Sequence, residues 1–380
     1  MSSTARSTGL VAVRSWSVEA VAIGFLYSFA ALGVVQKYAG TAAAIVALLL
    51  APVAGMAGVW AFDHAATVLT ARRADVLAAL LLAVAVVALL VVYPHANTDA
   101  TDAGTDRDDA ATIGARGLLD GENPYGRLTY LHQPISQLPV MLVVAMPFTW
   151  LFHWSAYELL VFLPLLYLLW RWLARDPRIA LVGLAAALAS PALLREYLTG
   201  GDLVVNVVLV AAGVQLVWRR PASLVAAALL GSALATRANF LIVLVPLAVA
   251  VHRRCGLTTA LRGLAVSLAV FAAIVVPVAL SEGGRTALSM NDKLSEVPGG
   301  APLVVSLVTV LAVGVALGTE RWRASRLWWQ IAGVQALFLL AIVLTDSVRH
   351  GRPDFFWLIS SYGVVPFLLG LAAVVARRER

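Results

Sequence analysis

Long apolar runs separated by short polar links make up most of this chain. The stretch 76–92, for example, contains no polar residue. A membrane helix needs about 20 mostly apolar residues, so this pattern predicts an all-α polytopic membrane protein. We expect about 12 transmembrane helices, over roughly 18–36, 41–62, 75–93, 155–171, 179–194, 203–218, 222–236, 239–252, 262–280, 302–318, 327–344 and 356–375.

One further apolar segment, 135–152, is ambiguous. Pro139 and Pro147 interrupt it, and only His153 and Trp154 separate it from the next run. If it does not cross and the N-terminus is inside, 18 of the 28 Lys and Arg residues are cytoplasmic, whereas a crossing leaves 10 there. Because Lys and Arg favour cytoplasmic loops, we expect both termini inside and 135–152 as an interfacial or re-entrant element on the outer side.

Composition and charge agree with one membrane domain over residues 1–380. The chain is 61% hydrophobic and 13% charged, whereas about 25% of a soluble protein is charged. The net charge of +7 comes from arginines beside apolar runs. That placement is typical of membrane orientation, so nucleic acid is not an expected partner. The single cysteine, Cys255, excludes an intramolecular disulfide.

The polar segment 94–134 holds 7 of the 21 acidic residues, and we interpret it as an extracytoplasmic acidic loop. Asp106, Asp108 and Asp109 crowd together in it. Crowded carboxylates raise one another's pKa, which suits a general base or a cation site. A solvated loop without a role is the alternative. The spacing indicates no metal cage, and no cofactor is expected.

The predicted topology gathers other polar residues on the same outer side. Arg237 lies in a very short link between two apolar runs, where an ionisable group is costly and suggests function. It could hold a phosphate, or it could reach lipid phosphates by snorkelling. Glu196 and Asp202 flank another outer loop, where an ion pair with Arg195 is the plain alternative. Asn206 shares a helix face with Asp202.

Two segments in the acidic region resemble a known family. The run Ala115–Tyr125 reads ARGLLDGENPY, and Thr129–Ile135 reads TYLHQPI. Together they resemble polyprenyl-phosphate-dependent glycosyltransferases of the GT-C fold, in the GT87-like and mannosyltransferase branch. Weaker matches follow in the expected order at 200–206, 235–239 and 360–366. The resemblance covers residues 95–376 loosely.

The resemblance implies transfer of a sugar, with mannose favoured, from a polyprenyl-phosphate donor to a lipid-linked or glycan acceptor outside the cytoplasm. Direct attack by the acceptor would invert the anomeric centre. Asp106 is the first candidate base, followed by Asp108 and Asp109. The donor phosphate would be held by Arg237, Arg349, His350 and Arg352. The sugar and acceptor would meet Asn123, Tyr125, Arg127, Tyr130, His132, Gln133, Arg195, Glu196 and Asp202.

Two other classes of function stay open. A transporter or lipid flippase predicts essential charges deep in several spans, and the middle of these spans is almost free of charge. A non-catalytic membrane subunit predicts that the aspartates tolerate substitution while assembly depends on the loop. Arabinofuranose or another hexose is an alternative to mannose, and the aromatic residues of 125–132 could instead belong to an interfacial belt.

Overall fold

The computed structural model describes residues 4–96, 106–281, 283–284, 300–319, 322–350 and 362–378. These residues are helical apart from turns and one isolated bridge between Leu128 and Pro134. The elements are α1 (Thr4–Leu49), α2 (Ala51–Val68), α3 (Ala71–Ala96), α4 (Asp106–Leu119), η1 (Pro124–Gly126), α5 (Pro139–Phe152), η2 (Ser155–Glu158), α6 (Leu159–Ala174), α7 (Pro177–Leu188), α8 (Pro191–Leu198), α9 (Leu203–Arg219), α10 (Leu224–Leu234), η3 (Ala238–Val243), α11 (Leu244–Cys255), α12 (Leu257–Ala279), α15 (Gly300–Leu317), α16 (Ala324–His350), α18 (Val364–Val375) and η4 (Ala376–Arg378).

Within these residues, six helical stretches are long and apolar enough to cross a membrane, and a bent pair adds a seventh. Shorter apolar helices pack among them, including α5, α9, α10 and α18. The chain is therefore an all-helical, multi-pass membrane protein. The count of twelve crossings and the orientation of the termini stay predictions.

A break at Gly40 divides α1 into two arms. Gly40 has φ 85° and ψ 168°, outside the helical region. The chain folds back after this break. Two contacts show this: Gly24 lies against the backbone of Ala51, and Gly55 lies against that of Ala20. Only residues without a bulky side chain allow helix backbones to approach so closely. The predicted spans 18–36 and 41–62 thus correspond to two antiparallel arms.

Three arginines at helix ends, Arg219, Arg253 and Arg254, gather at one end of the bundle, which we call the arginine end. Arg219 donates to the carbonyl of Trp172 at 3.1 Å, and Arg254 donates to that of Trp218 at 2.9 Å. Arg253 donates to Leu317 O at 3.0 Å. These bonds satisfy carbonyls that the last turns of α6, α9 and α15 leave open. They also place the ends of α6, α9, α11 and α15 beside one another.

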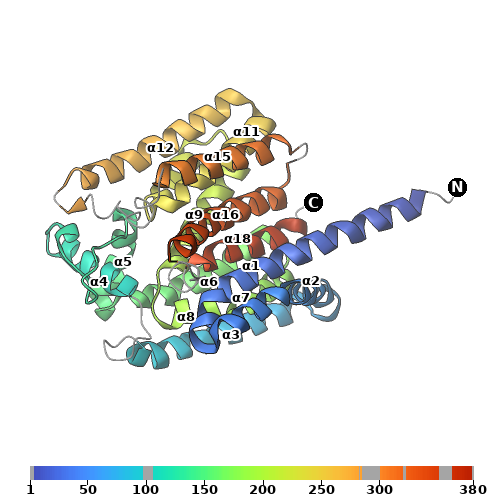
Figure 1. Ribbon diagram of the computed structural model, residues 1–380, viewed down its shortest axis with the longest axis horizontal. Helices are drawn as coiled ribbons and strands as arrows, with labels where there is room; N and C mark the ends of the chain where they lie inside the picture. The colour runs from blue at the N-terminus through green and yellow to red at the C-terminus, as the bar shows by residue number, and fades with distance from the viewer. Residues whose placement is uncertain are drawn as a thin grey trace.

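The opposite end of the bundle carries α4 and α5, which lie at one end of the long axis, far from the N-terminus (Figure 1). The start of α5 is tied to the end of α10, because Leu138 N donates to Thr236 O at 3.1 Å. Its end leads through His153, which has a positive φ of 68°, directly into η2 and α6. Both ends of α5 thus lie at the same end of the bundle, as a segment that does not cross would require.

The span predicted over 179–194 is broken in the structure. Two helices, α7 and α8, replace it and meet at an angle of 78°. Ser190 caps the second helix by accepting from Leu193 N, and Pro191, which has no N–H to donate, occupies its first position. The bend directs α8 and its Glu196 toward the α4 end.

The unique cysteine offers a test of orientation. Cys255 is exposed at the arginine end, and Gly126 is exposed at the α4 end with open space around its Cα. We expect a membrane-impermeant maleimide to leave Cys255 unlabelled in intact cells and to label Gly126→Cys in a Cys255→Ser background. Both should react after permeabilisation. Labelling of Cys255 in intact cells would invert the predicted topology.

Candidate functional site

The predicted base segment is a helix rather than a loop. Asp106 begins α4, and small residues along it are buried against α5. A Cβ on Gly114 would come within 2.7 Å of Leu142 Cδ2, which shows how closely the two helices pack. The acids sit in the first turn of α4, where carboxylates interact favourably with the helix dipole.

Two buried ion pairs connect α4 with α8, α9 and η3. Arg107 holds Glu196 through two parallel bonds of 3.1 and 2.8 Å. Arg237 holds Asp202 Oδ2 through its Nε and one terminal nitrogen, at 3.2 and 2.7 Å. Arg107 also lies 4.0 Å from Asp202 Oδ1. Residues 107, 196, 202 and 237 therefore form one charged cluster.

Tyrosines from two further elements complete this cluster. The Tyr362 hydroxyl accepts from Arg237 at 2.7 Å, and its ring lies 5.6 Å from the guanidinium carbon of each arginine. The Tyr93 hydroxyl donates to Asp108 Oδ2 at 2.8 Å. These contacts thus join α3, α4, α8, the start of α9, the start of η3 and Tyr362, two positions before α18.

Carboxyl groups outnumber guanidinium groups among the fully buried members of the cluster. Asp108, Glu158, Glu196 and Asp202 are each at most 2% exposed, whereas Arg107 and Arg237 are the buried arginines among the described residues. The half-buried Arg195 also lies within electrostatic range of Glu196. Glu158 lies within electrostatic range of Asp202 and Asp108, and its Oε2 has no hydrogen-bond partner among the described residues. The cluster is therefore acid-rich and has hydrogen-bonding capacity to spare.

Burial and neighbouring charge shift two titrating groups of α4. Burial raises the pKa of Asp108 well above its usual range, which favours the neutral acid. Its Oδ1 has no hydrogen-bond partner among the described residues. Burial lowers the pKa of Arg107, but the Glu196 and Asp202 carboxylates raise it more, so that pKa is raised overall.

Glycines let the α8–α9 turn approach the acids. Gly200 has a φ of 77°, and a Cβ there would lie 2.6 Å from Ala156 Cβ and 2.7 Å from the Tyr93 ring. Gly201 lies directly against the Glu196 carboxylate. The resemblance included this turn, and the packing explains why it needs glycine.

Substitution of Gly200 should therefore destabilise the protein. We expect Gly200→Ala to lower stability by about 2–4 kcal/mol, from a left-handed backbone and a steric overlap. Gly126→Ala is the matched control, since its Cβ would meet open space. The measurement is the thermal midpoint of the purified protein. Equal midpoints for both variants would contradict this packing.

The three candidate bases differ in access. Asp106 is half-buried, and its Oδ2 accepts from the Thr129 hydroxyl at 3.1 Å. Asp109 is also half-buried, whereas Asp108 is fully buried. A base must reach the proton that it abstracts, so Asp106 and Asp109 fit better than Asp108. The Thr129 hydroxyl also orients the Asp106 carboxylate.

The predicted sugar-binding residues separate into buried and exposed groups. Tyr125 is buried, and its hydroxyl donates to Gln137 O at 3.2 Å, so its ring does not line an open pocket as expected. Asn123 caps η1 by accepting from Tyr125 N at 3.1 Å. Arg127 pairs with Glu122 at the surface.

The turn over 129–133 presents the remaining predicted contacts. His132 and Gln133 are exposed, and Tyr130 is half-buried. Gln133 N donates to the Thr129 hydroxyl at 3.2 Å, which is the hydroxyl that contacts Asp106. This turn therefore lies beside Asp106, one of the two half-buried candidate bases.

The structure changes the role expected of Arg237. Its side chain is 0% exposed and is engaged by Asp202 and Tyr362, so it is not free to hold a donor phosphate. Arg349 and His350 end α16, but their side chains lie outside the described residues, as does Arg352 altogether. Arg195 precedes Glu196 on α8 and is half-buried, while the predicted partners of Arg195 pair with other arginines.

Sequence reasoning missed Arg107, Glu158, Tyr93 and Tyr362 as site residues. Glu158 carried a usable signal, because an acid at the start of an apolar run is costly unless it has a function or a partner. Arg107 gave none, since it stands among aspartates and resembles a solvated residue. Gln137, whose amide donates to Arg107 O at 2.8 Å, was missed as well.

Neither hollow described by the structure touches the charged cluster. One is an apolar crevice between α9, α10, α11 and α12, and the other lies at the turn between α2 and α3. Within the described residues, no group of three or more His, Cys, Asp or Glu side chains is placed to hold a metal.

Comparison with protein-family models, curated proteins and solved structures found no match.

Proposed function

We propose that this protein is a membrane glycosyltransferase that moves a sugar from a polyprenyl-phosphate donor to a lipid-linked or glycan acceptor. One observation carries the proposal: residues of the three segments that matched the family more weakly, 200–206, 235–239 and 360–366, meet at the charged cluster. Gly200 lies so close to Asp108 that a Cβ built on this glycine would be 3.2 Å from Asp108 Cβ. Asp202 pairs with Arg237, and Arg237 donates a hydrogen bond to the Tyr362 hydroxyl. Buried charged groups are costly in a membrane protein and suggest a function, and these groups come from segments that lie far apart in the sequence.

The acid-rich character of the cluster suits glycosyl transfer. The acceptor oxygen attacks the anomeric carbon while the bond from that carbon to the phosphate oxygen breaks, and the acceptor proton passes to Asp106. Positive charge develops on the sugar in such a transition state, and nearby carboxylates stabilise it. The leaving polyprenyl phosphate is a stable anion, so no general acid is required.

Arg237 and Arg107 act in this proposal as positioning residues. Each fixes a buried carboxylate, and both flank the Tyr362 ring. The donor phosphate would be held instead by the other residues predicted for it, namely Arg349, His350 and Arg352. The guanidinium groups of Arg107 and Arg237 are already paired with Glu196 and Asp202, so the phosphate needs cations outside the cluster.

The test is turnover by the purified protein. Reconstituted protein is incubated with polyprenyl-phosphate mannose, labelled in the sugar, and with a membrane lipid extract as acceptor. We expect a labelled glycolipid or glycan and an equal amount of released polyprenyl phosphate. The same assay with a polyprenyl-phosphate arabinofuranose donor identifies the sugar. An intact donor in every combination would favour a non-catalytic subunit, and movement of intact donor between leaflets would favour a flippase.

A further inference from the structure

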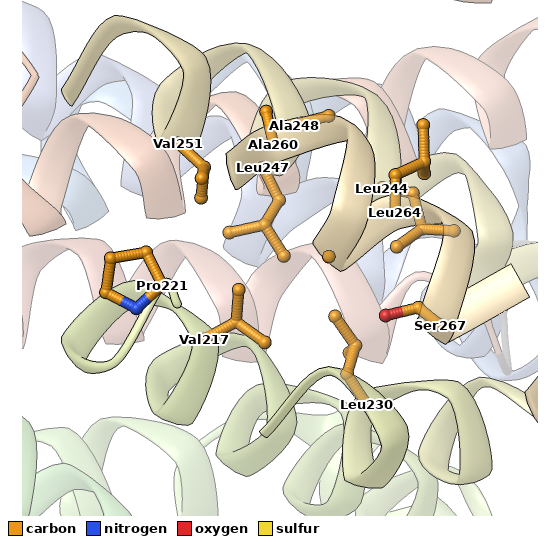
Figure 2. A pocket seen from close by; sticks show the side chains of 11 residues that line it. Val217, Pro221, Leu230, Leu244, Leu247, Ala248, Val251, Ala260, Leu264 and Ser267 are labelled. Atoms are coloured by element: carbon orange, nitrogen blue, oxygen red, sulfur yellow. The ribbon is translucent and has the colours of Figure 1, made fainter. Parts of the chain in front are cut away.

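An apolar crevice runs along the side of the bundle between the α9–α10 and α11–α12 helix pairs (Figure 2). Val217, Leu247 and Leu264 are among its lining residues. Ser267 is its one hydroxyl-bearing residue, and that hydroxyl is already bonded to Ala227 O at 2.8 Å. The crevice therefore offers hydrocarbon contacts and no free hydrogen-bonding side chain.

The crevice is narrow and open on one side. It contains about 310 Å³ of space counted out to that open side. A shape of this kind suits a flexible chain laid along the helices, and it does not suit an enclosed solute.

One end of the crevice opens at the arginine end. Pro221, Val251 and Ala260 line that end, within about a turn of the α9–α10 and α11–α12 links. The exposed Arg220 directly precedes Pro221. Arg254, also exposed, follows Val251 by three positions and so continues the same stripe of α11.

A tryptophan holds Arg254 in place at this mouth. The guanidinium carbon lies 3.7 Å from the centroid of the Trp218 ring, and one terminal nitrogen donates to Trp218 O at 2.9 Å. Neither 214–224 nor 247–268 contains an acidic residue. The mouth of the crevice is thus positive, and no acid of these segments neutralises it.

We propose that the crevice binds an anionic phospholipid, with the phosphate at Arg220 and Arg254 and one acyl chain along α11 and α12. Charge complementarity at the mouth selects an anionic lipid over a neutral one, and the apolar lining selects a lipid over a soluble anion. This site lies at the opposite end of the bundle from the charged cluster and does not depend on the proposed function.

The test uses phosphatidylglycerol and phosphatidylcholine, each with a photoreactive diazirine in an acyl chain, in vesicles that contain the full-length protein. Peptide mapping after irradiation measures labelling of α11 and α12. We expect phosphatidylglycerol to label these helices more strongly, and Arg220→Gln to reduce that labelling about fivefold. Ala248→Trp should also reduce it, because it fills the crevice without changing the charge.

Arg262→Gln is the matched control. Arg262 is exposed in the first turns of α12 but points away from the stripe formed by Ala260, Gly263, Leu264 and Ser267. Its labelling should equal that of the unmodified protein. Three results would each overturn the proposal. They are equal labelling by both lipids, a loss of labelling in Arg262→Gln as large as that in Arg220→Gln, and no labelling because a second copy of the chain covers the crevice.

Discussion

The Arg237→Met variant is expected to lose about 3–5 kcal/mol of stability, because it leaves a buried carboxylate without its partner. Arg237 is 0% exposed and makes two hydrogen bonds to Asp202 Oδ2. Asp202 would then keep only its longer contact of 4.0 Å with Arg107 among the ion pairs of the described residues, and Arg107 is already paired with Glu196. The remaining carboxylates would also repel one another more strongly. The thermal midpoint of the purified protein measures the loss.

The second partner provides the control for this prediction. Removing both charges in Arg237→Met/Asp202→Leu should recover more than half of the loss, since an apolar pair can replace a buried ion pair at little cost. Arg127→Gln breaks an exposed pair with Glu122 and should change stability by less than about 1 kcal/mol. A double variant that is less stable than Arg237→Met would contradict the view that the unpaired Asp202 causes the loss.

Several features of this site followed from the sequence because they depend on simple physical rules. Lys and Arg bias predicted which links share a side, and the structure places the ends of α6, α9 and α11 together. The same sorting grouped Arg237 with Asp202 and Glu196, which lie in one charged cluster. That grouping needed only the order of the apolar runs.

Other features could not follow from the sequence because they depend on packing between distant segments. The helix α4 has little apolar character, yet its alanines and glycines are buried against α5, so the segment resembled a loop. Arg107 pairs with Glu196 across 89 positions, and no local pattern specifies that partner. Arg237 was expected to be available for an anion, whereas the Tyr362 hydroxyl and Asp202 occupy it.

The second large effect is expected at Asp106. Asp106→Asn should lower the rate of sugar transfer by about 10²–10⁴-fold, because an amide cannot accept the proton of the acceptor hydroxyl. The variant keeps an oxygen that can accept from Thr129, so the fold should be retained. A thermal midpoint within a few degrees of the unmodified protein checks this.

Substitutions of neighbouring acids distinguish the loss of a catalytic base from a general loss of negative charge. Asp120→Asn removes an exposed carboxylate at the far end of α4 and should keep full activity. Asp108→Asn and Asp109→Asn remove the other candidate bases. If Asp108 or Asp109 carries the reaction instead, the loss follows that substitution and Asp106→Asn retains turnover.

The most direct measurement of the central claim is the initial rate of sugar transfer from labelled polyprenyl-phosphate mannose, or from the arabinofuranose donor if that is the sugar used. The rate is compared between the unmodified protein, Asp106→Asn and Asp120→Asn under identical conditions. The proposed mechanism predicts steady turnover by the unmodified protein and by Asp120→Asn, and a loss of at least about 100-fold in Asp106→Asn. Full turnover by Asp106→Asn, Asp108→Asn and Asp109→Asn alike, or no turnover by the unmodified protein, would contradict it.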